Sequence, residues 1–112
     1  MITATLKYPL KGVKIMVHTI TLKELQRIDP ASYQLIDIRT PQEFREFHLP
    51  RAINIPYDLL MTYPDNYLKK SQTYYLICGH GSLSYRASAI LQSYGYLTAS
   101  ISDGHQMRRF SR

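Results

Sequence analysis

Segments with the pattern of β-strands alternate along the chain with segments that carry helix signals, and this alternation most constrains the fold. Strands are expected over residues 15–20, 33–38, 52–55, 73–77 and 97–101. The runs 33–38 and 73–77 show little alternation of apolar and polar residues, as strands covered on both faces do. The sequence therefore predicts an α/β fold with a mainly parallel sheet.

Helix signals fill the intervals between the predicted strands. Thr21 and Glu24 have the spacing of a capping box, in which each side chain bonds to the other residue's backbone at a helix start. Thr40, Pro41 and Glu43 supply an N-cap, an N1 proline and a capping partner for a second helix. Further helices are expected over residues 57–61, 64–70 and 84–94, and a short basic helix after residue 104.

The length of 112 residues suits one domain. Met16 offers an alternative start, so we expect residues 1–15 to form an N-terminal extension and residues 16–112 to form the domain. No apolar run approaches the roughly 18 residues that span a bilayer, and the beginning lacks a signal-peptide pattern. The single cysteine excludes an internal disulfide and is typical of a reducing compartment, so we expect a cytoplasmic protein.

The formal net charge of +6 is dispersed along the chain. Basic residues occur as Lys69-Lys70, Arg86 and Arg108-Arg109, without a dense run or a nucleic-acid-binding motif. The charge therefore indicates a solvated basic surface or attraction for a small anion. We expect neither a nucleic-acid nor a membrane partner.

Cys78 stands where a buried strand is expected to end and a helix to begin, which in open α/β sheets is the edge where ligands bind. Gly79 and Gly81 allow the following loop to curl so that its N–H groups point at the sulfur, like an anion nest. The dipole of the next helix adds positive potential there. Both effects favour a thiolate, which is the nucleophilic form. A purely structural cysteine would not need the flanking Gly79-His80-Gly81.

Two motifs carry a resemblance to a known family over roughly residues 17–110. The first is Asp37-Ile38-Arg39-Thr40-Pro41-Gln42-Glu43-Phe44 with His48-Leu49-Pro50 and Ala52-Ile53-Asn54-Ile55-Pro56, and the second is Cys78-Gly79-His80-Gly81-Ser82-Leu83-Ser84. Together they resemble the rhodanese-like sulfurtransferase family. Four positions depart from its pattern: Phe47 and Arg51 replace glycines, Leu83 stands where many members have arginine, and His105 replaces the second glycine of Asp-Gly-Gly.

The resemblance implies a three-layer α/β/α fold around a mainly parallel sheet of five strands. It implies a sulfurtransferase in which Cys78 takes a sulfane sulfur from a small anionic donor such as thiosulfate, as a persulfide. The acceptor would be cyanide or a thiol, including a protein thiol, and the chemistry needs no metal or organic cofactor. The expected substrate-binding residues are Gly79, His80, Gly81, Ser82, Leu83 and Ser84, whose backbone amides would form the cradle.

The resemblance also implies structural roles around the site. Asp37, Arg39 and Glu43 are expected to form ion pairs and caps, and His48 is expected to be structural. For His80 we expect a conformational or hydrogen-bonding role, although a histidine next to a thiolate could also act as a base.

Two alternatives stay open. Leu83 and His105 are compatible with a non-catalytic binding or regulatory module of the same fold. Phosphatase or arsenate chemistry would need a loop one residue longer and an arginine six positions after the cysteine to clamp an oxyanion, and Ser84 stands there.

Overall fold

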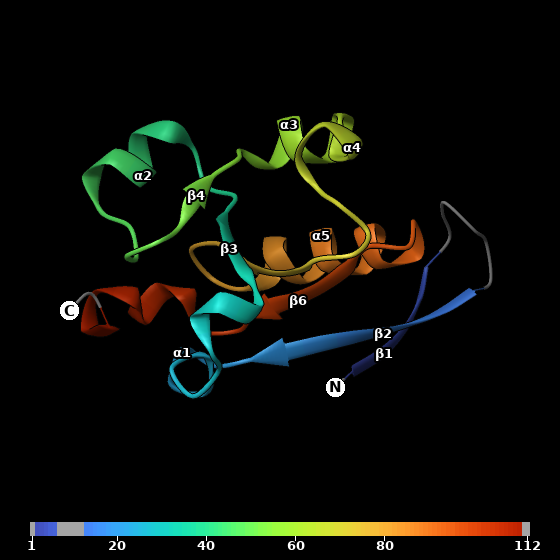
Figure 1. Cartoon of the computed structure of the whole chain (residues 1–112), viewed down its shortest axis with the longest axis horizontal. Helices are drawn as coiled ribbons and strands as arrows, with labels where there is room; N and C mark the ends of the chain where they lie inside the picture. The colour runs from blue at the N-terminus through green and yellow to red at the C-terminus, as the bar shows by residue number, and fades with distance from the viewer. Residues whose placement is uncertain (1, 7–12, 111–112) are drawn as a thin grey trace.

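A computed structural model describes residues 2–6 and 13–110 (Figure 1). Its strands form one sheet in the order β1-β2-β6-β5-β3-β4. The strands are β1 (Ile2–Leu6), β2 (Val13–Ile20), β3 (Gln34–Asp37), β4 (Ile53–Asn54), β5 (Thr73–Ile77) and β6 (Leu97–Ile101).

Five neighbouring strands of the sheet, β2, β6, β5, β3 and β4, run parallel to one another. This confirms the predicted α/β class and the parallel five-stranded sheet. β1 adds a further strand at the edge and pairs antiparallel with β2. β1 and the beginning of β2 belong to residues 1–15, which the sequence assigns to an extension. The part of that extension over residues 1 and 7–12 lies outside the described residues. The domain boundary at Met16 stays a prediction.

Two helices begin at the capping signals that the sequence carries. Thr21 and Thr40 each form a complete capping box, with Glu24 and Glu43 respectively. The helices are α1 (Leu22–Leu25), α2 (Pro41–Glu46), α3 (Tyr57–Thr62), α4 (Pro64–Tyr67) and α5 (Ser82–Ser93), with 3₁₀ turns η1 (Pro30–Ser32) and η2 (Gly104–Phe110). None of the helices in the described part of the chain has the length and apolarity needed to cross a bilayer.

The predicted start of the longest helix at Ser84 was wrong, because α5 begins at Ser82. Gly81 adopts a left-handed conformation and occupies the N-cap position. Its carbonyl oxygen accepts the N–H of Tyr85 at 3.0 Å, so the first helical hydrogen bond forms two residues earlier than expected. Ser82 and Leu83 therefore lie in the first turn of α5 and not in the loop.

Helices cover both faces of the sheet, as the three-layer prediction requires (Figure 1). One hydrophobic cluster joins Leu76 of β5 to Leu60 of α3 and Leu91 of α5. On the other face, Ile77 of β5 packs in a cluster with Leu22 of α1 and Met107 of η2. Successive strand residues point to opposite faces, so β5 contributes to both cores and its carboxyl end is fixed from both sides.

Arg51 is the one non-glycine residue in the described part of the chain with a positive φ, at 71°. The resemblance described above implies a glycine at this position, and a positive φ is the backbone conformation that glycine adopts most readily. The Arg51 Nη2 donates to the Pro30 carbonyl oxygen at 3.4 Å. Phe47, the other replaced glycine, has extended backbone (φ −168°), and its ring lies 4.5 Å from the Arg108 guanidinium carbon.

Replacing Arg51 tests the cost of this backbone. A left-handed residue with a Cβ costs about 1–2 kcal/mol relative to glycine. We expect Arg51→Gly to be about 1 kcal/mol more stable than Arg51→Ala, since both variants lose the bond to Pro30 and only glycine loses the strain. Urea unfolding followed by circular dichroism measures the difference, and equal midpoints for the two variants would contradict it.

Candidate active site

The Cys78 sulfur lies directly after β5, at the carboxyl edge of the parallel sheet. The residue is buried, with 3% of its surface exposed. Its Sγ accepts the backbone N–H of Gly81 at 3.1 Å and that of Ser84 at 3.3 Å. Of the amides expected to form the cradle, these two therefore donate to the sulfur directly, and both favour negative charge on it.

Ser84 connects the loop to the neighbouring strand through its hydroxyl group. The Ser84 Oγ lies 3.4 Å from Sγ of Cys78, donates to the Gly81 carbonyl at 3.1 Å and lies 2.7 Å from the Ser100 Oγ. Ser84 and Ser100 are fully buried. Ser100 was missed by the sequence reasoning, and the only signal for it is a serine placed in the otherwise apolar end of β6.

Two glycines allow the loop to pack against other backbone. A Cβ on Gly81, where φ is 89°, would lie 2.6 Å from the Ser102 carbonyl oxygen. A Cβ on Gly104 would collide with the carbonyl oxygen of Cys78. Gly79, in contrast, has open space at this position. Close approach therefore requires glycine at 81 and 104, whereas residue 79 is not restricted in this way.

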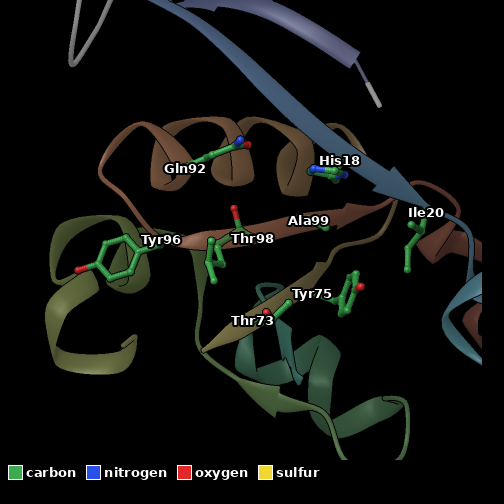
Figure 2. A pocket seen from close by; sticks show the side chains of 9 residues that line it. His18, Ile20, Thr73, Tyr75, Gln92, Tyr96, Thr98 and Ala99 are labelled. Atoms are coloured by element: carbon green, nitrogen blue, oxygen red, sulfur yellow. The ribbon is translucent and has the colours of Figure 1, made fainter. Parts of the chain in front are cut away.

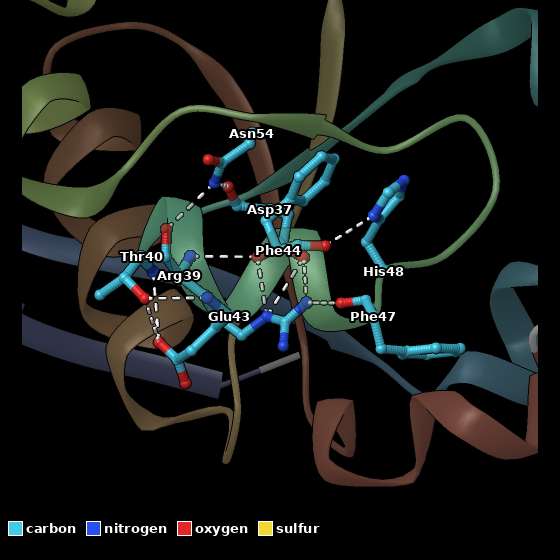
Figure 3. A network of polar contacts seen from close by, with 8 residues as sticks. All are labelled: Asp37, Arg39, Thr40, Glu43, Phe44, Phe47, His48 and Asn54. Carbon is cyan, nitrogen blue, oxygen red and sulfur yellow. Dashed lines mark hydrogen bonds and ion pairs between the residues drawn. The ribbon is translucent and has the colours of Figure 1, made fainter.

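A buried ion pair braces the segment between β3 and α2 (Figure 3). Asp37 is fully buried, and its Oδ2 lies 2.8 Å from the Arg39 Nη2. The Arg39 Nε also donates to this carboxylate, and Nη2 donates to the Phe47 carbonyl at 2.6 Å. The pKa of Arg39 is raised above its usual value, mainly by the hydrogen bonds to Asp37 and further by the charges of Asp37 and Glu43, while burial opposes the shift.

The remaining motif residues near this segment are structural, as expected. Glu43 caps α2 through Thr40. The His48 Nδ1 lies 2.7 Å from the Phe44 carbonyl oxygen, and the two rings stack with centroids 3.7 Å apart. Asn54, which had no predicted role, donates from Nδ2 to the carbonyls of residues 37 and 39 at 2.9 and 3.0 Å (Figure 3).

A groove of about 620 Å³ contains the cysteine loop. Three stretches of chain line it: Ile38–Pro41 with Glu43, Pro56–Asp58, and Cys78–His80 with Ser82 and Leu83. The groove thus brings together most of the predicted site residues, whereas Gly81 and the α5 residue Ser84 are buried and do not line it.

His80 is exposed and lies toward a second histidine. Its ring is nearly parallel to that of His105, with centroids 6.4 Å apart. Among the described residues, no hydrogen bond joins His80 to the Cys78 sulfur, and both roles considered for His80 stay predictions. Within residues 2–6 and 13–110, no three histidine, cysteine or acidic side chains cluster as metal ligands.

A separate pocket of about 310 Å³ lies over β2, β5, β6 and α5 (Figure 2). Its lining includes His18, Tyr75 and Leu97 but no residue of the cysteine loop. Burial raises the pKa of Tyr75. The one cysteine of the sequence lines the groove and not this pocket, so the groove beside Cys78 is the candidate active site.

Comparisons with known proteins agree with this geometry. The sequence profile of the rhodanese-like domain family matches residues 21–105. The chain therefore belongs to the rhodanese-like domain family.

Three relatives illustrate the similarity. Rhodanese-like domain-containing protein 15, chloroplastic, from Arabidopsis thaliana is 27% identical over an alignment of 97 residues, and the match covers 77% of this chain and 53% of that protein. The reduced Bacillus anthracis CoADR-RHD structure is 28% identical with a TM-score of 0.72, over 81% of this chain and 16% of that chain. The human single-domain sulfurtransferase TSTD1 is 20% identical with a TM-score of 0.70, over 87% and 99% of the two chains.

The share of each relative that aligns with this chain differs widely. The chain spans about half the length of the Arabidopsis protein and a small part of the Bacillus chain. The match to TSTD1 extends over nearly all of that chain, and at 20% identity it concerns the fold.

The two loop glycines give a matched pair of substitutions. Gly81→Ala adds a Cβ in a left-handed conformation and against the Ser102 carbonyl, so we expect a loss of more than about 2 kcal/mol of unfolding free energy. Gly79→Ala meets open space and should change it by less than about 0.5 kcal/mol. Urea unfolding of both variants measures this, and equal losses would show that the loop does not depend on the close contact.

Proposed function

We propose that this protein is a single-domain sulfurtransferase that moves a sulfane sulfur from a donor such as thiosulfate to a thiophilic acceptor through a Cys78 persulfide. The observation that carries the proposal is the position of the Cys78 Sγ, which accepts the N–H groups of Gly81 and Ser84 beside an open groove. Membership of the rhodanese-like family supports it. The lone thiol fits a reducing compartment, and we propose the cytoplasm.

In the first step the Cys78 thiolate attacks the outer sulfur of the donor. With thiosulfate, a new sulfur–sulfur bond forms to Sγ while the donor's own sulfur–sulfur bond breaks. Sulfite leaves with the electron pair, and the protein keeps a persulfide. The two amides donate to Sγ, so they stabilise the Cys78 thiolate that attacks the donor and that the second step restores.

In the second step a nucleophilic acceptor attacks the outer sulfur of the persulfide. Cyanide would leave as thiocyanate, and a thiolate would leave as a new persulfide. In both cases the bond to Sγ breaks and its electron pair returns to Cys78 as thiolate. Neither step needs an external oxidant, reductant, metal or organic cofactor.

Mass spectrometry of the intact protein tests the proposal. After incubation with a panel of donors that includes thiosulfate, polysulfide and an organic persulfide, we expect Cys78 to gain one sulfur atom. Cyanide should remove that atom as thiocyanate. Cys78→Ser should lose both reactions, because the chain has no other thiol.

The control for this variant is the fold, since Cys78 is buried in a core cluster. The circular dichroism spectrum and unfolding midpoint of Cys78→Ser should stay close to those of the unchanged protein. A correctly folded protein that gains no sulfur from any donor would contradict the proposal and would favour a non-catalytic binding module.

A further inference from the structure

The ribbon formed by β1 and the first part of β2 lies outside residues 21–105, the part of the chain that matches the family. In this ribbon, Ile2–Leu6 pair with Val13–Val17. The remaining residues of β2, His18–Ile20, pair with β6 on the other side. The two pairings therefore use different parts of β2, and the ribbon, which we call the arm, extends the sheet as two strands (Figure 1).

An arm of two strands needs further contacts to be stable. A two-stranded hairpin on its own is marginally stable in water, and a third strand or a packed helix is normally required. Helix α5 supplies part of this support, since Val17 at the end of the arm packs with Ala89 and Tyr85. The outer edge of β1 has no strand partner among the described residues, because β1 is the first strand in the sheet order.

The two edges of the sheet differ in how they are protected against pairing with another chain. β4, at the far edge, has only two residues and stands between Pro50 and Pro56. Short edge strands and prolines are common means of preventing such pairing. β1 has five residues, ITATL, without proline or charge, and its register with β2 is unbroken by a bulge. The edge at β1 is therefore open to a further strand.

The sequence of β1 is self-complementary for antiparallel pairing. When two copies of β1 meet about a twofold axis at Ala4, this residue faces its own copy. Ile2 of one chain then faces Leu6 of the other, and Thr3 of one chain faces Thr5 of the other. Apolar residues oppose apolar residues and threonine opposes threonine, which are favourable cross-strand pairs. A twofold interface requires this symmetry, because the same surface must fit itself.

We propose that two copies of this chain associate through β1, with the two β1 strands antiparallel and in register about Ala4. The two arms then form one continuous antiparallel sheet, and each β1 gains a strand partner at its outer edge. A second copy is the partner that this strand fits, because the pairing pattern is symmetric within ITATL itself.

The proposed interface leaves the groove beside Cys78 open. The arm contains the amino-terminal part of β2, which runs parallel with β6 and β5. Cys78 follows the carboxyl end of β5, so the arm and the cysteine loop belong to opposite ends of the parallel strands. The association is therefore independent of the proposed sulfur transfer.

Light scattering coupled to size-exclusion chromatography tests the association of the full chain over a range of protein concentrations. We expect the mass to approach twice that of one chain as the concentration rises. Ala4→Lys should return the mass to that of one chain, because two lysines would face each other on the axis and like charges directly opposite are destabilising. Ile53→Lys is the matched control: it adds the same charge at the β4 edge, where Ile53 is 47% exposed, and should leave the dimer intact.

Cysteine cross-linking tests the register, in a Cys78→Ser background that has no other thiol. Ala4→Cys places its two copies directly opposite each other, at a separation that a disulfide can span. Mild oxidation should therefore give a covalent dimer on a non-reducing gel. Thr3→Cys is the matched control, because its two copies are diagonal neighbours about 7–8 Å apart and should cross-link poorly. Adding Thr5→Cys to Thr3→Cys should restore the cross-link.

Three results would overturn the proposal. The first is the mass of a single chain at every concentration. The second is a dimer that Ile53→Lys disrupts and Ala4→Lys does not, which would put the interface at the β4 edge. The third is cross-linking of Thr3→Cys that equals or exceeds that of Ala4→Cys, which would exclude the register about Ala4. None of these results bears on persulfide formation at Cys78, so the two proposals can fail separately.

Discussion

Contact between backbone segments at the carboxyl edge of the sheet sets the geometry of the cysteine loop. Gly81 lies against the Ser102 carbonyl, and Gly104 lies against the carbonyl of Cys78 itself. Both contacts are too close for a Cβ, because the backbone that follows β5 packs directly against the backbone that follows β6. The left-handed turn at Gly81 then starts α5 early enough for the Ser84 N–H to reach the sulfur. The reactive position of the thiol is therefore a product of backbone packing.

The ion pair between Asp37 and Arg39 stabilises the opposite wall of the groove. Removing one partner of a buried pair typically costs about 3–5 kcal/mol, because the other charge is left without compensation. Here the pair also forms two hydrogen bonds with the backbone: Arg39 Nη2 donates to the Phe47 carbonyl, and the backbone N–H of Arg39 donates to the Asp37 carboxylate. This arrangement fixes the connection from β3 to α2. It also engages the Arg39 guanidinium, a group that could otherwise bind an anion. The wall is thus rigid and nearly neutral at this point.

Local signals in the sequence predicted the parts of the fold that depend on neighbouring residues. Both capping boxes and the strand Thr73–Ile77 were predicted correctly, because hydrogen bonding over three residues and a run of buried residues are visible in sequence. The start of α5 could not be predicted, because it depends on the left-handed φ of Gly81, which tertiary contact with Ser102 selects. The buried hydrogen bond to Ser100 and the carboxylates of the groove depend on segments far apart in the chain. The sequence therefore indicated the position of Cys78 at the end of β5 better than it indicated the residues around that cysteine.

The burial of Cys78 bears on how readily its thiol is oxidised. Oxidation of cysteine by peroxides follows both thiolate character and exposure, and these two properties are separated here: the amides favour the anion, while 3% exposure limits collisions with solutes. Attack on Sγ is open chiefly to reagents that can present a terminal atom along the groove. We therefore expect the Cys78 sulfur to be converted to sulfinic and sulfonic acids more slowly than an exposed thiolate would be.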